Sequence, residues 1–110
     1  MPATTSRPTT DDLFKALADP TRREILALLR RQRRSVGDLA ANFRTSRPAI
    51  SKHLRILRDA QLVKDTPERT SRLCELNPAP LKQIDAWLDD YKVFWDRSLN
   101  RLKAHMENQR

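Results

Sequence analysis

Apolar residues recur three and four positions apart along most of the chain, and polar or proline-rich interruptions divide it into short elements. Residues 1–10 are mainly Thr, Ser and Pro with little to bury, so we expect a flexible tail there. One compact domain is expected over 11–110. The spacing predicts helices over 11–19, 20–31, 36–43, 47–59 and about 78–107.

Three of these helices carry clear start signals. Asp19 can cap the helix that begins at Pro20, where the missing N–H of proline costs nothing. Ser35 is followed three residues later by Asp38, a pattern similar to a capping box. Ser46 is a good N-cap for the next helix, and Pro48 then falls in the first turn, where backbone N–H groups have no helical partner. Because only residues 44–46 separate Phe43 from the helix that begins at Arg47, the two helices should cross steeply as a helix-turn-helix.

The stretch 61–76 predicts two short strands around a turn. Pro67 suits the second position of the turn 66–69, because its ring fixes φ near the value required there. Arg69 and Arg72 would then lie near the tip of the hairpin, within reach of a nucleic-acid backbone or minor groove. Together with the helices, this predicts a mostly α fold with a small β-hairpin.

The last predicted helix has an apolar stripe that one small domain cannot cover. A helix of about 28 residues is about 42 Å long, longer than a small domain is wide. We expect Asn77 to cap this helix, and we expect a second copy of the chain to cover the stripe in a homodimer. The expected interface also includes apolar residues of the first helix. Its members are Leu13, Phe14, Leu17, Leu81, Ile84, Leu88, Tyr91, Trp95, Leu99 and Leu102.

The chain of 110 residues has 22 Lys and Arg against 14 Asp and Glu, a net charge of +8. Residues 20–58 contain eleven basic and two acidic residues, a net of +9, so the remainder sums to −1. A positive field confined to one third of the chain favours nucleic acid over a membrane surface as partner. The single cysteine, Cys74, excludes an internal disulfide. With no segment resembling a signal peptide or membrane span, we expect a cytoplasmic protein.

The stretch 47–59 places its apolar and polar residues on different sides of the predicted helix. The inward cluster is Ile50, Leu54 and Leu57. An adjacent polar sector comprises Arg47, Ser51, Arg55 and Arg58, with Lys52 further round. A helix that enters a DNA major groove needs this division, because its first turn meets base edges and its flanks meet phosphates.

In the stretches 13–29, 36–63 and 76–88 the sequence resembles the ArsR family of bacterial winged helix-turn-helix repressors, with ADPTRREIL and SRPAISKHLRIL the most specific parts. The resemblance implies a homodimeric repressor of double-stranded DNA, released by an inducer of unknown chemistry. Twofold symmetry would place two recognition helices about 34 Å apart on an inverted repeat. The positions that match the family's recognition helix imply DNA contacts from Ser46, Arg47, Pro48, Ser51, Lys52 and His53.

Metal-sensing members of that family carry a paired-cysteine motif before the turn, or a His and carboxylate cluster on the last helix. Here 36–43 has no cysteine, and the last helix offers His105 among scattered acids. We therefore expect no metal and no cofactor. With one glycine in the chain there is no phosphate-cradling loop, and no Ser, His and Asp arrangement can be argued from the spacing, so an enzyme is not expected.

Two other functions stay open from the residues alone. The first is a sensor that responds through the Cys74 thiol or through a small molecule bound by aromatic residues of the last helix. The second is a helical module that uses the last helix to bind another protein. DNA release on oxidation would favour the sensor, whereas a monomer without DNA affinity would favour the module.

Overall fold

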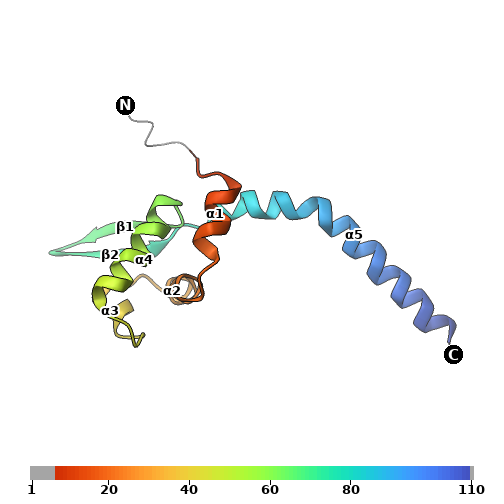
Figure 1. The fold of residues 1–110 in the computed structure, drawn as a ribbon, viewed down its shortest axis with the longest axis horizontal. Helices are drawn as coiled ribbons and strands as arrows, with labels where there is room; N and C mark the ends of the chain where they lie inside the picture. Colours follow the sequence, from red (N-terminus) through yellow and green to blue (C-terminus); the bar gives the residue numbers. More distant parts are fainter. Residues whose placement is uncertain (1–6, 110) are drawn as a thin grey trace.

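The computed structural model describes residues 7–109 and contains the elements in the order that the sequence predicts. Their bounds are α1 Thr10–Leu17, α2 Pro20–Arg31, α3 Val36–Ala40, α4 Arg47–Asp59, β1 Val63–Glu68, β2 Ser71–Leu76 and α5 Leu81–Asn108. The helices α1–α4 and the hairpin form one body, and α5 extends away from it (Figure 1). The prediction of a mostly α fold with one β-hairpin and a long last helix is confirmed.

The starts of three helices are fixed by side-chain caps. Asp19, Ser35 and Ser46 each accept a hydrogen bond from the backbone N–H three residues later, at 3.0, 3.1 and 3.2 Å. Pro20 and Pro48 lie in the first turns that follow, where no helical hydrogen bond is lost. The local sequence alone therefore determines where α2, α3 and α4 begin.

The tail expected over residues 1–10 is too long. Thr9 and Asp12 form a capping box, with Asp12 N donating to Thr9 Oγ1 at 3.0 Å and Thr9 N to Asp12 Oδ2 at 2.9 Å. The hydrogen bond from the Thr9 backbone lowers the pKa of the Asp12 carboxyl. Thr10 is already helical. Residues 1–6 lie outside the described part of the chain.

One hydrophobic core joins α1–α4 to the base of the hairpin, and the three inward residues predicted for α4 are all fully buried in it. Its members are Leu13, Ala16, Ile25, Leu29, Leu39, Ile50, Leu54, Leu57, Ala60, Leu62, Val63 and Cys74. Because α4 contributes to the centre of this core, burial fixes its rotation about its own axis.

Four residues expected at a dimer interface pack within the chain itself. Leu13 is 0% exposed and belongs to the core. Leu17, Leu81 and Ile84 are half-buried and pack against that core. The helical wheel showed that these positions share an apolar side, but it could not show that α1 and the first turn of α5 cover one another inside one protomer.

The expectation that Asn77 caps the last helix is wrong. The backbone N–H groups of Leu81 and Lys82 donate to the carbonyls of Pro78 and Ala79, at 2.9 and 3.1 Å, so a tight turn precedes α5. The Asn77 side chain accepts the Ala79 backbone N–H at 3.4 Å within this turn and donates to the Gln61 carbonyl at 2.8 Å, which ties the turn to the loop before β1. None of the described helices, α5 included, combines the length and the apolar run that a bilayer crossing requires.

The hairpin turn lies two residues beyond its predicted position. Glu68 pairs with Ser71, so the loop consists of two residues, and Pro67 lies inside β1 opposite Arg72. Arg69, the first loop residue, has φ of 55°, in the left-handed region that a two-residue hairpin loop requires. Pro67 is tolerated because the alternating register places its missing N–H on the outer edge of the ribbon.

The helix-turn-helix connection is also longer than predicted. The helix α3 ends at Ala40, and residues 41–46 form the connection to α4. Asn42 stabilises it by donating its Nδ2 to the Asp38 carbonyl at 2.8 Å, and Phe43 still packs against the core. Phe43 continues the helical spacing of apolar residues, and for that reason the pattern overestimated α3.

We predict that Leu54→Ala lowers the free energy of unfolding by about 2–5 kcal/mol, because it removes a fully buried side chain and leaves a cavity. The matched control is Arg55→Ala on the exposed side of the same helix, which should change stability by less than about 0.5 kcal/mol. Urea unfolding at one protein concentration measures both. Equal losses would show that α4 does not bury its Leu54 side.

Candidate nucleic-acid interface

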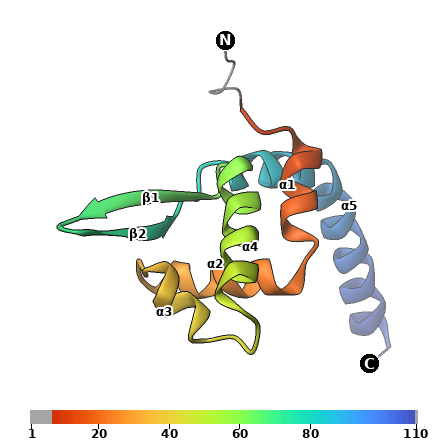
Figure 2. The ribbon, with the colours of Figure 1, turned by 60° about the vertical axis from the view of Figure 1, so that its left-hand side comes forward.

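The side of α4 that faces away from the core carries cations that nothing in the described chain neutralises. Arg47, Ser51, Lys52 and Arg55 are exposed, and among residues 7–109 their side chains have no hydrogen-bond or ion-pair partner. In Figure 2, α4 stands between the hairpin and α1, with α2 behind it. The helix therefore presents three free positive charges and a hydroxyl to solvent.

The first turn of α4 is held by a side-chain cap, a backbone hydrogen bond and a proline. Ser46 Oγ accepts from Ala49 N at 3.2 Å, and Ile50 N donates to the Ser46 carbonyl at 3.1 Å. Pro48 is exposed and contributes a fixed φ to the same turn. Ser46 and Pro48 thus fix the backbone of the first turn, and with it the position from which Arg47 and Ser51 project.

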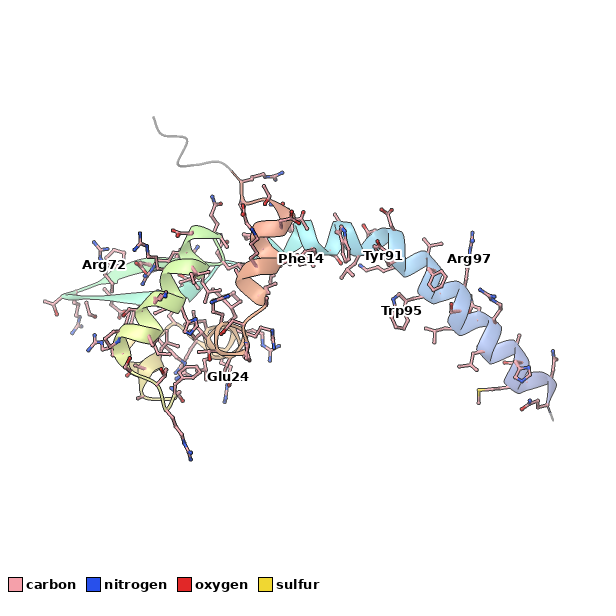
Figure 3. All side chains as sticks on the ribbon, viewed as in Figure 1. Phe14, Glu24, Arg72, Tyr91, Trp95 and Arg97 are labelled. Carbon is pink, nitrogen blue, oxygen red and sulfur yellow. The ribbon has the colours of Figure 1, made fainter. Side chains whose placement is uncertain are left out.

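The hairpin adds a second cationic element. Arg69 lies at the tip of the hairpin, and Arg72 lies opposite Pro67. Both are exposed, and among the described residues neither has an ion-pair partner. Both views show the hairpin projecting beyond the helices, and Figure 3 places Arg72 on it. A bond from Thr66 Oγ1 to Glu75 Oε1, at 2.9 Å, links the two strands across their face.

Arg58, for which a phosphate contact was expected, is half-buried and bonded within the chain. Its Nε lies 3.1 Å from Asp65 Oδ1, and its Nη2 lies 3.7 Å from Cys74 Sγ. The helical wheel placed Arg58 in the same sector as Arg47 and Arg55. The hairpin crosses that sector at the C-terminal end of α4, so Arg58 binds the hairpin base instead.

His53 also faces the body of the protein. Its Nδ1 lies 3.2 Å from Arg22 Nη1 and 3.9 Å from Asp19 Oδ2. Asp19 itself has a lowered pKa, chiefly because its carboxylate accepts the Arg22 backbone N–H and secondarily because His53 lies close. Sequence reasoning missed Arg22, because the contact joins elements far apart in the chain and leaves no local signal.

The base of the hairpin is fastened to the connection between α2 and α3. Arg34 and Cys74 exchange two backbone hydrogen bonds, from Arg34 N to Cys74 O at 3.1 Å and from Cys74 N to Arg34 O at 2.7 Å. Burial raises the pKa of the Cys74 thiol, and the Arg58 guanidinium opposes that effect in part. The described residues contain no group of three or more His, Cys, Asp or Glu side chains placed to hold a metal ion.

A helix-turn-helix with an exposed cationic second helix, flanked by a cationic β-hairpin, defines the winged helix class of DNA-binding proteins. Residues 19–65 match the family described as bacterial regulatory protein, arsR family. The chain is 43% identical over 89 residues to the HTH-type transcriptional regulator Rv2034 of Mycobacterium tuberculosis, covering 81% of this chain and 80% of that protein. It therefore belongs to the arsR family and is a DNA-binding transcriptional regulator.

Two further proteins support the assignment. The transcriptional repressor SdpR of Bacillus subtilis is 38% identical over 78 residues, which cover 71% of this chain and 87% of that repressor. The solved structure of an ArsR-like transcriptional regulator from a Rhodococcus species superposes with a TM-score of 0.69 at 34% identity. That superposition covers 84% of this chain and 88% of the other. The similarity therefore extends well beyond the helix-turn-helix in both sequence and fold.

We predict that iodoacetamide alkylates Cys74 at pH 8 about a hundredfold or more slowly in the folded protein than in denaturant, because the thiol is buried and its raised pKa disfavours the reactive thiolate. Mass spectrometry of timed samples measures both rates. Comparable rates would return Cys74 to consideration as a thiol sensor.

Proposed function

We propose that this regulator is a homodimeric repressor that binds an inverted-repeat operator through two copies of α4. The observation that carries the proposal is the set of unpaired side chains on the outer side of α4, next to a hairpin with two further unpaired arginines. Arg47 and Ser51, in the first turns, are the base-reading candidates. Lys52 and Arg55 are better placed for phosphates.

The proposed hairpin contacts extend this surface along the duplex. Arg69 and Arg72 lie on a projecting ribbon whose base is fixed by the Arg34–Cys74 bonds, so the ribbon can deliver charge to the backbone beside the groove that α4 enters. If each dimer neutralises about 6–10 phosphates, log K should fall with log salt at a slope of about −5 to −9.

The proposed dimer contact lies on the outer part of α1 and along α5. Phe14 meets Trp87 edge to face with ring centroids 5.1 Å apart, and Trp87 lies 4.9 Å from Tyr91. Beyond Tyr91, no described residue of another element covers α5, and Trp95 is 63% exposed. Trp95 and Arg97 project from opposite sides of the helix (Figure 3), so α5 is amphipathic where it stands alone.

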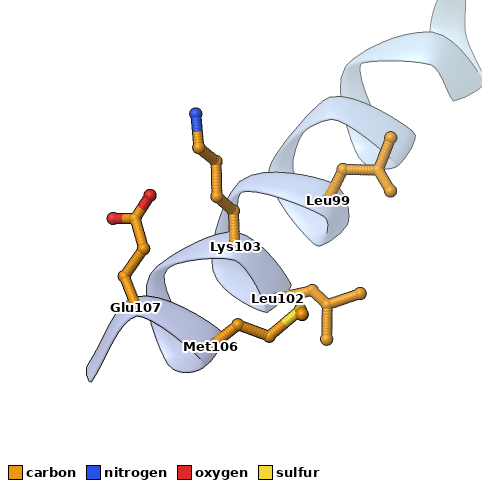
Figure 4. Close-up of a pocket in the computed structure, with 5 residues that line it drawn as sticks. All are labelled: Leu99, Leu102, Lys103, Met106 and Glu107. Carbon is orange, nitrogen blue, oxygen red and sulfur yellow. The ribbon is translucent and has the colours of Figure 1, made fainter. Parts of the chain in front are cut away.

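The far end of α5 shows the same lack of cover. Leu99, Leu102 and Met106 are more than half exposed and line an open hollow together with Lys103 and Glu107, all five residues coming from α5 itself (Figure 4). A continuous apolar stripe of this length favours pairing with an identical stripe, as a twofold dimer requires. The exposed members of the expected interface are Phe14, Leu88, Tyr91, Trp95, Leu99 and Leu102.

We predict that Arg47→Ala lowers affinity for a duplex selected by the wild-type protein by about 1–3 kcal/mol and relaxes base preference at one position of each half-site. The control is Arg97→Ala, which removes the same charge from the side of α5 opposite Trp95. Fluorescence anisotropy with the selected duplex and single-base variants measures both. Unchanged affinity and preference for Arg47→Ala would remove this residue from the base-reading set.

We predict that replacing Trp95 and Leu99 together by Lys converts a dimer into a monomer at micromolar concentration, because two charges would enter the apolar contact. Sedimentation equilibrium gives the mass, and Arg97→Ala should leave it unchanged. A double variant that keeps the wild-type mass would show that α5 does not form the contact. A wild-type protein that is already monomeric would contradict the proposed dimer.

A further inference from the structure

The Arg22 side chain joins three helices at one point. Its Nε donates to the Ala16 carbonyl at 2.7 Å and its Nη2 to the Lys15 carbonyl at 3.1 Å, both in the last turn of α1. Its Nη1 lies 3.2 Å from His53 Nδ1 on α4, while its own backbone N–H is capped by Asp19. One guanidinium therefore connects the end of α1, the start of α2 and the middle of α4.

The geometry of the guanidinium makes this connection directional. The carbonyls in the last turn of a helix lack the usual N–H partner four residues later. In α1 the Ala16 carbonyl binds Nε of Arg22, and the Lys15 carbonyl, which also accepts the Ala18 backbone N–H at 3.3 Å, binds Nη2. Because a guanidinium is planar and its donors are fixed in direction, these two bonds also fix the direction of Nη1. Arginine has no acceptor, so a hydrogen bond between Arg22 Nη1 and His53 Nδ1 requires the tautomer in which Nδ1 is the acceptor.

The connection lies between the surface proposed to pair two copies and the surface proposed to bind DNA. Trp87 of α5 packs on Phe14 of α1, α1 ends on the Arg22 guanidinium, and Arg22 reaches α4 through His53. A twofold dimer meets two half-sites only if each α4 is held at a set position relative to the pairing helices. The Arg22–His53 contact is the polar contact in this chain of contacts from α5 through α1 to α4.

We infer that Arg22 is a positioning residue for operator binding, acting through Nδ1 of His53 to hold α4 in register with the α1–α5 layer. The inference rests on the proposed function and deepens it. Neither side chain touches the operator in this arrangement. The family resemblance implied a DNA contact for His53, and the orientation of its ring toward Arg22 and Asp19 favours the positioning role instead.

The test uses two substitutions at His53, each of which places a polar atom at the position of one of the two ring nitrogens. Asn places an acceptor oxygen where Nδ1 lies, whereas Gln places its amide where Nε2 lies. The duplex is one that the wild-type protein selects from random sequences. We expect His53→Asn to bind this duplex within about threefold of wild type. His53→Gln and Arg22→Ala should each bind about ten- to a hundredfold more weakly, because each loses the charged hydrogen bond.

Three readouts separate positioning from contact. The salt slope should equal that of wild type in every variant, since a lost phosphate contact would reduce it by about 1. The double variant Arg22→Ala/His53→Gln should bind no more weakly than Arg22→Ala alone, because the two residues act through one bond. Single-base preferences should be unchanged.

The matched control is Arg23→Ala. Arg23 Nη1 donates to the Leu17 carbonyl at 2.7 Å, so it also caps α1, but its side chain has no hydrogen bond or ion pair with the described residues of α4. It should bind the selected duplex as wild type does, and urea unfolding of each variant identifies any that fail to fold. His53→Asn and His53→Gln keep the α1 cap intact, so they remain informative even if Arg22→Ala unfolds.

Other outcomes overturn the inference while leaving the proposed function in place. Rescue by Gln and not by Asn would assign His53 a direct contact through Nε2. Equal losses for Arg22→Ala and Arg23→Ala would reduce Arg22 to a helix cap. Failure of the wild-type protein to select any sequence would instead contradict the proposed function itself.

Discussion

The burial of one side of α4 is the constraint on which the rest of the molecule depends. Ile50, Leu54 and Leu57 are fully buried, so α4 cannot rotate about its axis without exposing them. That fixed rotation sends Arg47 and Ser51 outward from a first turn that Ser46 and Pro48 hold in place. The same apolar contacts that stabilise the fold therefore orient the side chains proposed to meet DNA.

The chain uses its arginines in two distinct ways. Some are bound within the protein, where they connect elements. Arg22 joins α1 to α4, Arg34 joins the hairpin to the α2–α3 connection through its backbone, and Arg58 joins α4 to the hairpin. Others are exposed and without partners among the described residues, and those on α4 and the hairpin form the proposed DNA-binding surface. A count of basic residues cannot separate these groups, although only the second can neutralise phosphates.

The sequence was a good guide to structure wherever the cause is local. Caps and helical spacing predicted the starts of α2, α3 and α4 and the buried side of α4, because those features depend on residues within a few positions of one another. The ends of elements were less predictable. Phe43 continues an apolar spacing past the end of α3, and Pro67 suits a turn as well as it suits the edge of a ribbon.

The candidate site divides in the same way. The exposure of Arg47, Ser51, Lys52 and Arg55 follows from the position of each residue around α4. The orientation of Arg58 and His53 depends on which distant element lies over them, and no spacing within the helix contains that information. Leu13 was expected at the dimer contact but is buried in the protein's own core. The apolar side of a helix does not show whether its own chain or a second copy covers it.

The most direct measurement of the central claim is cleavage of operator DNA by a reagent attached at position 51. A Ser51→Cys variant carries one exposed thiol, because the protein's own cysteine is buried, and an iron chelate attached there cuts nearby DNA. The account predicts two clusters of cuts about one helical turn, or about 10 base pairs, apart, and no such clusters when the chelate is attached through Arg97→Cys. Diffuse cuts from position 51, or the same pattern from position 97, would contradict it.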